Sequence, residues 1–593
     1  TAAAGAAMAV SILAGHPQTA IYVFYMAIAY WIYRTRGLSL SKGRGAVCPL
    51  SSILRHPLLY LIVFVFFALG LSAIQWLPTL EFTRFSTRAQ VNYAFTSHGF
   101  APYEIVTLLI PGYLGGSPLY IGIIPMLLAV AAFDDRAGAK PHAGGLLVDA
   151  VMRARGFAPT AAFFWLLTAF VALLLSFGDA LFAYPLAYLF APGFAQVRDQ
   201  ERIALLWSFA LAMLAALGAA RLGRPFSRAA RVRLAGVERR LGGLTAGLVA
   251  LIALAYGGML ASADQKVNLF PGALRQLVPA FFWLAAAWGL WRLRLHVAVS
   301  RRWLMIATLG LIGLNLFSVN APSHFQQPTP SDYYPETTLV QTLRAELKAH
   351  PLARVASEGL LPGAHNAGAD FDFQEITGND PLQLAETAQF DRTMQELRKW
   401  QLLGVRYIIT RREIAHGAFS LVASEGEAHL YRNAEALPRA WLVHAVEVVP
   451  ADVYGVLNRP DFDPAQVVAL NAEPPIALPA SAPAASPVEV AAYAPGRLSL
   501  RARAAANGLL VIGEVYYPGW QAVVDGQRAP LLRADSILMA VPLSAGPHQV
   551  ELTFEPDSVK IGGLISGLTL LAWLVIIARS GILTLPRHRT PIR

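Results

Sequence analysis

Apolar stretches of this chain alternate with polar loops, and nearly every second loop is rich in arginine. One such loop, residues 34–56, holds five Lys or Arg, and another, residues 221–240, holds seven arginines. The loops between them, at 78–116, 178–202 and 262–276, hold two Lys or Arg each. Positive residues of membrane proteins stay on the cytoplasmic side of the bilayer. The alternation therefore predicts a polytopic α-helical membrane protein and gives its orientation.

The composition agrees with a membrane protein. Of the 593 residues, 55% are hydrophobic and only 14% are charged, which is too apolar for an ordinary soluble protein. The net charge of +11 does not indicate nucleic-acid binding, because residues 320–560 hold 18 Lys and Arg against 27 Asp and Glu. We therefore expect no nucleic-acid partner. Cys48 is the single cysteine, so the sequence excludes an intrachain disulfide and a cysteine metal cluster.

Several apolar stretches are long enough to cross about 30 Å of hydrocarbon as helices. We expect membrane spans at residues 19–33, 57–78, 117–133, 160–177, 203–221, 242–261, 277–293, 303–319 and 561–579. Residues 1–14 form a shorter apolar run that has no charged flank. We expect this run to be the end of a helix that begins upstream of Thr1, in a chain that lacks its N-terminal part.

The pattern divides the chain into four parts. Residues 1–319 are predicted to form a transmembrane helical domain of about nine spans, the first incomplete. Residues 320–438 form an extracytoplasmic α/β region, and residues 439–560 an extracytoplasmic β-sandwich. Residues 561–593 add a C-terminal transmembrane helix and a cytoplasmic tail.

The soluble segment changes its hydrophobic period along its length. Apolar residues recur at helical spacing from Leu339 to Leu347, and a second helix is predicted over 383–402. From about residue 439 the period is two, which indicates strands separated by turns such as Asp525-Gly526. The Pro/Ala stretch 474–487 is typical of an insertion between strands.

Two external stretches, Tyr103–Pro111 and Leu181–Phe190, are apolar and aromatic but too short to span the bilayer. Segments of this kind lie along the membrane interface or re-enter between helices. We expect them to frame an opening to the bilayer.

The predicted external face collects acidic, basic and histidine side chains. The candidates for a site are His16, Glu81, Arg84, Glu104, Arg198 and Arg202. Arginine pairs with phosphate oxygens in bidentate fashion, and a carboxylate can deprotonate a hydroxyl nucleophile. The set therefore suits a lipid-linked phosphate substrate, and no metal-ligand spacing accompanies it.

Five of these six candidates also have a structural explanation. Gly15-His16-Pro17 is typical of a helix end with an incidental histidine. Glu81 precedes Arg84 by three residues, which suits a surface ion pair. Arg198 and Arg202 precede a helix, where cations are disfavoured, so helix capping does not explain them, but contact with lipid headgroups does.

Several sequence blocks resemble the bacterial YfhO membrane-protein family. They are LAGHPQTAIY (13–22), QWLPTLEFTR (75–84), PGFAQVRDQERIALL (192–206), LLGVRYIITR (402–411), LYRNAEALPRAWLV (430–443) and EVYYPGWQAVVDGQ (514–527). The block VPLSAGPHQVELTFEPDSVKIGGLISGL (541–568) is similar to the C-terminal end of that family. The resemblance runs from about residue 13 to residue 580, and its YYPGW…VDG block is the most specific part.

YfhO proteins are similar to GT-C glycosyltransferases, so the resemblance implies transfer of a sugar from a polyprenyl-phosphate donor to a cell-envelope glycopolymer. It also implies a multi-pass protein of the bacterial plasma membrane, with residues 320–560 outside and membrane lipids as partners. No cofactor is certain, and a divalent metal stays open. The catalytic carboxylate of such enzymes sits on the first external loop, which we expect upstream of Thr1.

His16 of GHPQ, Glu81 of PTLE, Arg198 and Arg202 match family motifs. The resemblance gives Glu81 and His16 supporting roles in catalysis, and gives Arg198 and Arg202 the donor phosphate. Arg84 and Glu104 are further substrate-binding candidates on the same face. Family members often have proline between the two arginines, where this chain has Asp199-Gln200-Glu201.

Two other functions fit the same sequence. A lipid-linked-sugar transporter would need charged residues in mid-span, and the predicted spans hold almost none. A non-catalytic envelope-assembly protein would recognise glycan through its sandwich.

Overall fold

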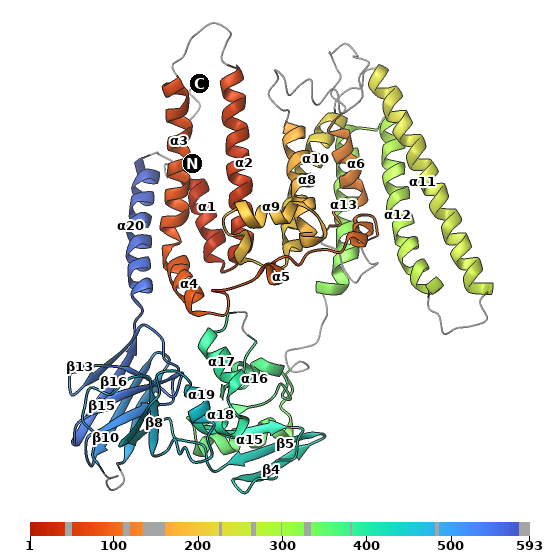
Figure 1. Cartoon of the computed structure of the whole chain (residues 1–593). Coiled ribbons are helices and arrows are strands. Elements are labelled where there is room, and N and C mark those ends of the chain that lie inside the picture. The colour runs from red at the N-terminus through yellow and green to blue at the C-terminus, as the bar shows by residue number, and fades with distance from the viewer. Residues whose placement is uncertain are drawn as a thin grey trace, which may run out of the picture. The chain divides into compact units, whose positions relative to one another are not determined.

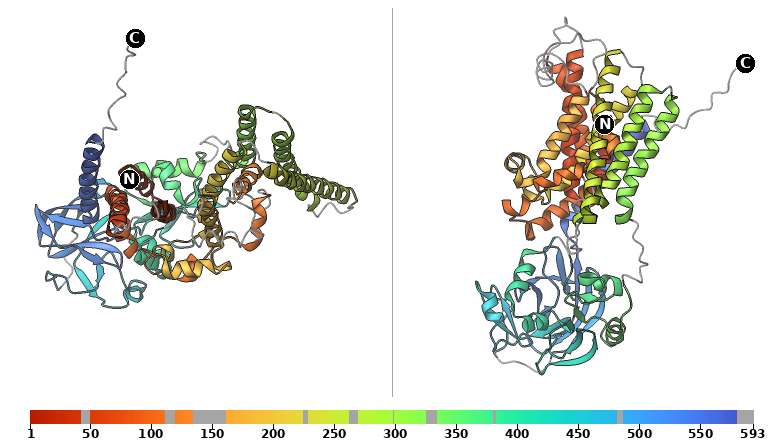
Figure 2. Two further views of the ribbon diagram at one scale, coloured as in Figure 1. Left: turned by 90° about the horizontal axis from the view of Figure 1, so that it is seen from above. Right: turned by 90° about the vertical axis from the view of Figure 1, so that its right-hand side faces the viewer.

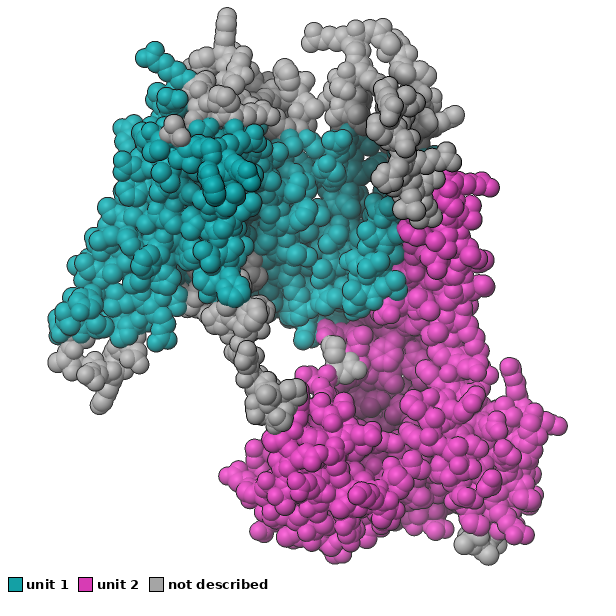
Figure 3. Space-filling view, turned by 180° about the vertical axis from the view of Figure 1, so that it is seen from behind, with its two compact units in different colours: residues 1–69, 91–326 teal, residues 70–90, 327–593 magenta. Residues whose placement is uncertain are grey.

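The computed structural model describes residues 1–41, 50–110, 119–133, 161–223, 228–261, 269–297, 299–324, 334–379, 382–480 and 486–579. The chain forms two compact units, shown in Figure 3. Unit 1 comprises residues 1–69 and 91–326, and unit 2 comprises residues 70–90 and 327–593. The described part of unit 1 is helical, whereas unit 2 combines β-sheets with helices.

Unit 1 consists of long helices connected by short helical turns (Figure 1). The long helices are α1 (Ala2–Leu13), α2 (Pro17–Ser41), α3 (Leu50–Leu71), α8 (Ala161–Ser176), α10 (Ala204–Leu222), α11 (Arg228–Ala261), α12 (Leu269–His296) and α13 (Arg301–His324). The short ones are α5 (Tyr93–Thr96), η1 (Pro102–Leu108), α6 (Ile123–Ala131), η2 (Gly178–Ala180), α9 (Ala183–Phe190), η3 (Phe194–Gln196) and η4 (Gln200–Ile203). Helices α11 and α12 lie side by side in both Figure 1 and Figure 2.

Five helices of the described residues are long and apolar enough to cross a membrane. They are Gln200–Leu222, Arg231–Ala261, Phe270–His296, Arg301–Val319 and Asp557–Arg579. The bent pair Leu58–Leu71 and Ala73–Phe85 makes a sixth if it is one span. These helices, together with the sheets of unit 2, confirm a polytopic membrane protein with a sheet-rich domain.

The span expected at 19–33 lies within the 25-residue helix α2, which is not one of these five candidates. The remaining expected spans are shorter helices or partly fall outside the described residues. The span expected at 160–177 is the 16-residue helix α8, and the one expected at 117–133 contains the 9-residue helix α6. Residues 111–118 and 134–160 lie outside the described part of the chain, as do the basic residues there. The number of nine spans therefore stays a prediction.

The span expected at 57–78 differs from a single helix. The chain breaks at Ser72 between α3 and α4 (Ala73–Phe85), and the two segments are bent by 71°. Such a break frees a carbonyl at the end of one helix and an N–H at the start of the next. Both groups need partners wherever the surroundings are apolar.

Helix α20 (Asp557–Arg579) supplies these partners within unit 2. The hydroxyl of Ser566 accepts a hydrogen bond from Ile74 N at 3.0 Å and donates one to Gly70 O at 3.2 Å. The two helices approach closely because Gly562 has no side chain: a Cβ there would lie 2.7 Å from Ala73 O. Small residues permit such close helix packing in membranes.

Ser566→Ala should therefore lower the stability of the protein by about 1 kcal/mol, the size of hydrogen bonds measured between membrane helices. Ser558→Ala in the same helix is the matched control, because the Ser558 hydroxyl is buried without a hydrogen-bond partner among the described residues. Thermal unfolding in micelles measures both variants. Equal melting temperatures for the two would contradict the bridging role of Ser566.

The first sheet of unit 2 is mixed and has the strand order β2-β1-β3-β5-β4. Its strands are β1 (Arg354–Ala356), β2 (Gln374–Glu375), β3 (Val405–Thr410), β4 (Phe419–Glu425) and β5 (Ala428–Asn433). Its helices are α15 (Thr338–Ala349), α16 (Ala367–Phe371), α17 (Ala385–Thr393) and α18 (Glu396–Leu402), with a short turn η5 (Ala364–Asn366). The helix from Leu339 to Leu347 is confirmed, whereas the one expected over 383–402 is divided into α17 and α18.

Two further sheets form a β-sandwich, with the strand orders β6-β11-β15-β14-β8-β7 and β13-β12-β16-β10-β9. The strands of the first are β6 (Ala440–Val443), β7 (Ala445–Val448), β8 (Val467–Leu470), β11 (Gly508–Ile512), β14 (Leu532–Ala534) and β15 (Leu538–Leu543). The strands of the second are β9 (Val488–Ala494), β10 (Arg497–Ala504), β12 (Trp520–Val524), β13 (Gln527–Ala529) and β16 (Gly546–Phe554). Asp525 and Gly526 both have positive φ and connect β12 to β13 as predicted.

The first sandwich sheet is buried on both faces. Leu510 and Ile512 of β11 pack against the second sheet, and Leu509 and Val511 pack on the opposite side against helices α17, α18 and α19 (Val453–Leu457). This explains why β11 is a continuous apolar run in a region that otherwise has a period of two.

Asp535 lies in this buried layer, between β14 and β15. Its carboxylate Oδ1 accepts a hydrogen bond from Ala469 N at 2.8 Å, while Oδ2 has no partner among the described residues. Its φ of +46° suits Asp or Asn better than most residues. Burial raises the pKa of the Asp535 carboxyl to about 7 from its ordinary value of 3.8.

This raised pKa predicts how stability depends on pH. Between pH 3.8 and about 7 the folded chain keeps a proton on Asp535 that the unfolded chain releases. The free energy of unfolding should therefore fall as pH rises through this window, by at most about 1.4 kcal/mol per pH unit. Asp535→Asn should remove this slope while keeping the hydrogen bond to Ala469. Melting temperatures of both proteins from pH 4.5 to 8 test this, and a constant difference between them would disprove it.

A candidate anion-binding site

The turn between α1 and α2 begins the site in unit 1. Gly15 has a φ of +81°, which ends α1, and Pro17 is the first residue of α2. Proline therefore starts the next helix here. The turn leaves His16 exposed and places Gln18 in the first turn of α2, where its side chain is 4% exposed.

A buried polar chain then anchors the segment that precedes α10. The Nε2 group of Gln18 lies 2.8 Å from Tyr22 Oη and 2.6 Å from Arg198 O. Tyr22 donates in turn to Gln200 Oε1 at 2.9 Å, and Gln200 is fully buried. Gln200 is also held by α5, because Gln200 Nε2 donates a hydrogen bond to Thr96 O at 2.9 Å. These contacts fix the backbone on both sides of Asp199.

The anchored segment brings two guanidinium groups to one carboxylate. Asp199 Oδ2 lies 3.3 Å from Arg198 Nε and 2.8 Å from Arg202 Nη2. Arg202 Nη1 also lies 3.1 Å from His16 Nε2 and 3.3 Å from Gln18 Oε1. On the other side of the ring, His16 Nδ1 accepts a hydrogen bond from Thr19 N at 3.3 Å and lies 2.9 Å from Thr19 Oγ1.

This group, called the Arg198–Arg202 cluster below, carries a surplus of one positive charge when His16 is neutral. The arginine side chains remain 46% and 42% exposed, so their other N–H groups are accessible to a ligand. Exposed pairs of this kind add little stability. The arrangement suits the binding of an anion such as phosphate.

One aromatic side chain lies beside the cluster, and a short apolar helix precedes the cluster in the chain. The Arg198 guanidinium lies 5.6 Å from the centre of the Phe95 ring. Helix α9, eight residues long, buries Tyr184 but leaves Leu189 and Phe190 69% and 79% exposed. This confirms that the stretch from Leu181 to Phe190 is too short to span, and its exposed apolar side fits an interfacial helix.

Glu81 belongs to unit 2 and has a partner there. Tyr517, in the loop between β11 and β12, donates to Glu81 Oε1 at 3.1 Å. Burial and the nearby Glu81 carboxylate raise the pKa of the Tyr517 hydroxyl, which keeps it protonated as a donor. The Tyr517 ring stacks on Phe82 at 6.0 Å between ring centres. The contact ties α4 to the sandwich, and the ion pair that spacing suggested between Glu81 and Arg84 does not form.

The other two candidates, Glu104 and Arg84, have different surroundings. Glu104 Oε1 accepts a hydrogen bond from Ala101 N at 3.0 Å and so caps the turn η1, which is a structural role. Arg84 lines a small cavity of unit 2 beside Tyr517. The structure thus unites His16, Arg198 and Arg202, whereas Glu81 and Arg84 lie in unit 2.

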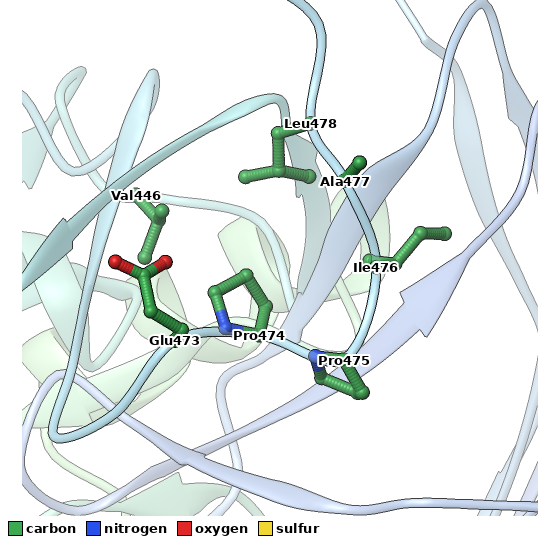
Figure 4. A pocket seen from close by; sticks show the side chains of 7 residues that line it. All are labelled: Val446, Glu473, Pro474, Pro475, Ile476, Ala477 and Leu478. Atoms are coloured by element: carbon green, nitrogen blue, oxygen red, sulfur yellow. The ribbon is translucent and has the colours of Figure 1, made fainter.

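A larger cavity of about 500 Å³ lies on the sandwich, lined by Val446 and residues 473–478 (Figure 4). Glu473 supplies its charged side chain, and the rest of the lining is proline and aliphatic side chains. Among the described residues, no three His, Cys, Asp or Glu side chains gather as a metal site would require. The sandwich cavity therefore has fewer charged and polar side chains for binding or catalysis than the Arg198–Arg202 cluster.

Sequence reasoning missed the residues that hold the site together. Tyr22 lies within an apolar span, where a single tyrosine gives no signal of a buried hydrogen bond. Gln200 lies among charged residues, and nothing in its sequence neighbourhood shows that it is buried. Tyr517 is part of the YYPGW block, but its contact with Glu81 joins residues 436 positions apart.

Fold and site together define a polytopic membrane protein with a sheet-rich domain and an exposed arginine cluster. Residues 461–566 match the family model described as bacterial membrane protein YfhO. The matched segment holds strands β8 to β16 and the start of α20, and there the match confirms the resemblance to the YfhO family. No curated protein and no solved structure matches the chain.

Proposed function

We propose that this protein is a GT-C-type glycosyltransferase that moves a sugar from a polyprenyl-phosphate donor to a cell-envelope glycopolymer. The observation that carries the proposal is the Arg198–Arg202 cluster, in which two accessible guanidinium groups share one carboxylate. The cluster would stabilise the negative charge that develops on the donor phosphate as the sugar leaves. The reaction would take place on the extracytoplasmic face of the bacterial plasma membrane, where residues 320–560 would also lie.

The residues around the cluster would have supporting roles. His16, held by Arg202, would orient the departing phosphate through its ring. Asp199 is engaged by both arginines, so it would position them and would not act as a base. The carboxylate that activates the acceptor hydroxyl is not assigned to a described residue. The exposed apolar side of α9 would lie in the interface, where a lipid-linked donor is found.

Removal of both guanidinium groups tests the proposal. Arg198→Ala combined with Arg202→Ala should lower sugar transfer from a polyprenyl-phosphate donor by a factor of about 100 or more, since each charge-assisted contact contributes about 1.5–3 kcal/mol. Membranes that contain the variant, a radiolabelled lipid-linked sugar and envelope polymer provide the assay.

Arg501→Ala combined with Arg503→Ala is a matched control with the same loss of charge on strand β10 of the sandwich. It should leave transfer unchanged. Unchanged transfer in the Arg198 and Arg202 double variant would disprove the phosphate role. A wild-type protein that transfers no sugar but binds envelope glycan would favour the envelope-assembly function.

A further inference from the structure

Unit 2 contains a small polar pocket of its own. It has a volume of about 180 Å³ and lies between the end of α4, the start of α17, the loop after β11 and strand β14. Its polar lining consists of Arg84, Glu386, Thr387, Tyr516, Tyr517 and Arg533. A cavity in which several polar side chains converge is a candidate for ligand binding.

The charges in this pocket do not cancel. Arg533 forms an ion pair with Glu386, and its guanidinium lies 4.9 Å from the centre of the Tyr516 ring. The Arg84 guanidinium forms no ion pair and no hydrogen bond with a described residue. One cation of the lining is therefore not compensated by an ion pair, and a guanidinium can bind an anion in bidentate fashion.

The two tyrosines differ in whether the hydroxyl group already forms a hydrogen bond. The Tyr517 hydroxyl donates a hydrogen bond to Glu81 Oε1 at 3.1 Å. The Tyr516 hydroxyl has no hydrogen-bond partner among the described residues, although its ring is partly buried. A free phenol, an aromatic face and the carboxylate of Glu386 are groups that bind the hydroxyls and the apolar face of a sugar ring.

We propose that this pocket binds a phosphate ester of a sugar or polyol, with its phosphate on Arg84 and its hydroxyls on Tyr516 and Glu386. The volume is below the range of about 300–1,000 Å³ typical of drug-sized ligands, so the ligand is a single ring or short polyol. This binding does not depend on the proposed transfer reaction.

Two sources carry this chemistry, a soluble sugar phosphate and the headgroup of a lipid. The pocket adjoins α4, and the Tyr517 ring contacts Phe554, three residues before the candidate span α20. A lipid headgroup can therefore be the ligand as well as a soluble sugar phosphate, and the experiment below distinguishes the two.

The test uses the full chain in nanodiscs of phosphatidylcholine, because a detergent with a sugar headgroup would compete. Glucose 6-phosphate, glucose and inorganic phosphate are titrated separately by calorimetry. We expect glucose 6-phosphate to bind most tightly, Arg84→Ala to weaken it about tenfold or more, and Tyr516→Phe to weaken it by about fivefold. The control Arg501→Ala, which removes an exposed arginine paired with Glu489, should leave binding unchanged.

Phosphatidylglycerol added to the discs assigns the source. If it displaces glucose 6-phosphate in the wild type, the pocket takes a lipid headgroup, and if it does not, the ligand is soluble. Absence of glucose 6-phosphate binding, or equal binding by Arg84→Ala with an unchanged melting temperature, would overturn the proposal. Equal affinity for inorganic phosphate and glucose 6-phosphate would also overturn it, since the polyol contacts would then contribute nothing.

The two proposals can fail independently. The Arg198→Ala and Arg202→Ala double variant should retain glucose 6-phosphate binding at wild-type affinity even though it loses sugar transfer. Loss of glucose 6-phosphate binding in that variant would place the ligand at the Arg198–Arg202 cluster. It would then overturn the proposal that the pocket of unit 2 binds this ligand.

Discussion

Glu514→Ala should lower the free energy of unfolding by about 3–5 kcal/mol, the cost of leaving buried charges without their partner. Glu514 Oε1 accepts from Arg439 Nη1 at 3.0 Å, from Arg354 Nη2 at 3.2 Å and from Tyr493 Oη at 3.3 Å. Arg439 is only 8% exposed. One carboxylate therefore compensates two guanidinium groups that are largely removed from water.

The same group joins the sheets of unit 2. Arg354 lies on β1 of the mixed sheet, Arg439 directly precedes β6, and Tyr493 lies on β9 of the sandwich. Arg439 also donates to Leu352 O at 2.8 Å, next to β1. Burial, together with the charge of Arg439, lowers the pKa of Arg354 to about 10. Without Glu514 the two cations would repel each other across this junction.

Chemical or thermal unfolding in micelles, followed by tryptophan fluorescence, measures the effect. Glu489→Ala is the matched control, since Glu489 pairs with Arg501 at 3.7 Å and both side chains are exposed. It should change stability by less than about 1 kcal/mol. If both variants unfolded alike, the junction would not depend on Glu514.

Gly178→Ala should lower the stability of the protein by about 3 kcal/mol. Gly178 has a φ of +56°, and a Cβ there would lie 2.0 Å from Ser97 O. The strain of a left-handed residue costs about 1–2 kcal/mol, and overpacking adds about 1–3 kcal/mol. The chain approaches so closely here because Asp179 N donates to Ser97 O and Phe100 N donates to Ser176 O, both at 2.9 Å.

The substitution should also disturb the Arg198–Arg202 cluster. Gln200 N donates to His98 O at 2.7 Å, and the segment that contains His98 would have to move away from Gly178. Gly426→Ala is the control, because Gly426 has a similar φ of +58° but nothing within 4 Å of its Cβ position. A melting temperature of Gly178→Ala equal to that of Gly426→Ala would show that backbone strain alone matters.

The membrane class and the strand pattern could be predicted because they depend on local composition and period. Loop arginines and apolar runs mark spans, and the change of period near residue 439 marks the sandwich. The break at Ser72 could not be predicted, since its freed backbone groups are satisfied by Ser566, almost 500 residues away. The division of the predicted helix 383–402 into α17 and α18 likewise reflects packing against the sandwich.

The candidate site could likewise be predicted only in part. His16, Arg198 and Arg202 were recognisable from their motifs and residue types. Their mutual distances depend on Gln18, Tyr22 and Gln200, which connect segments about 180 residues apart. Glu81 was a reasonable candidate by sequence, but its contact with Tyr517 belongs to unit 2.

Hydrophobicity and charge act on each stretch of the chain separately, so the membrane class and the sheet-rich segment can be predicted without the fold. Which polar groups meet depends on how the whole chain packs. Arg198 and Arg202 share Asp199, and Glu514 joins two arginines, whereas the Arg84 guanidinium has no ion pair with a described residue. A buried polar group without a hydrogen bond costs free energy, so buried polar groups are paired. The packed fold determines which groups are close enough to pair.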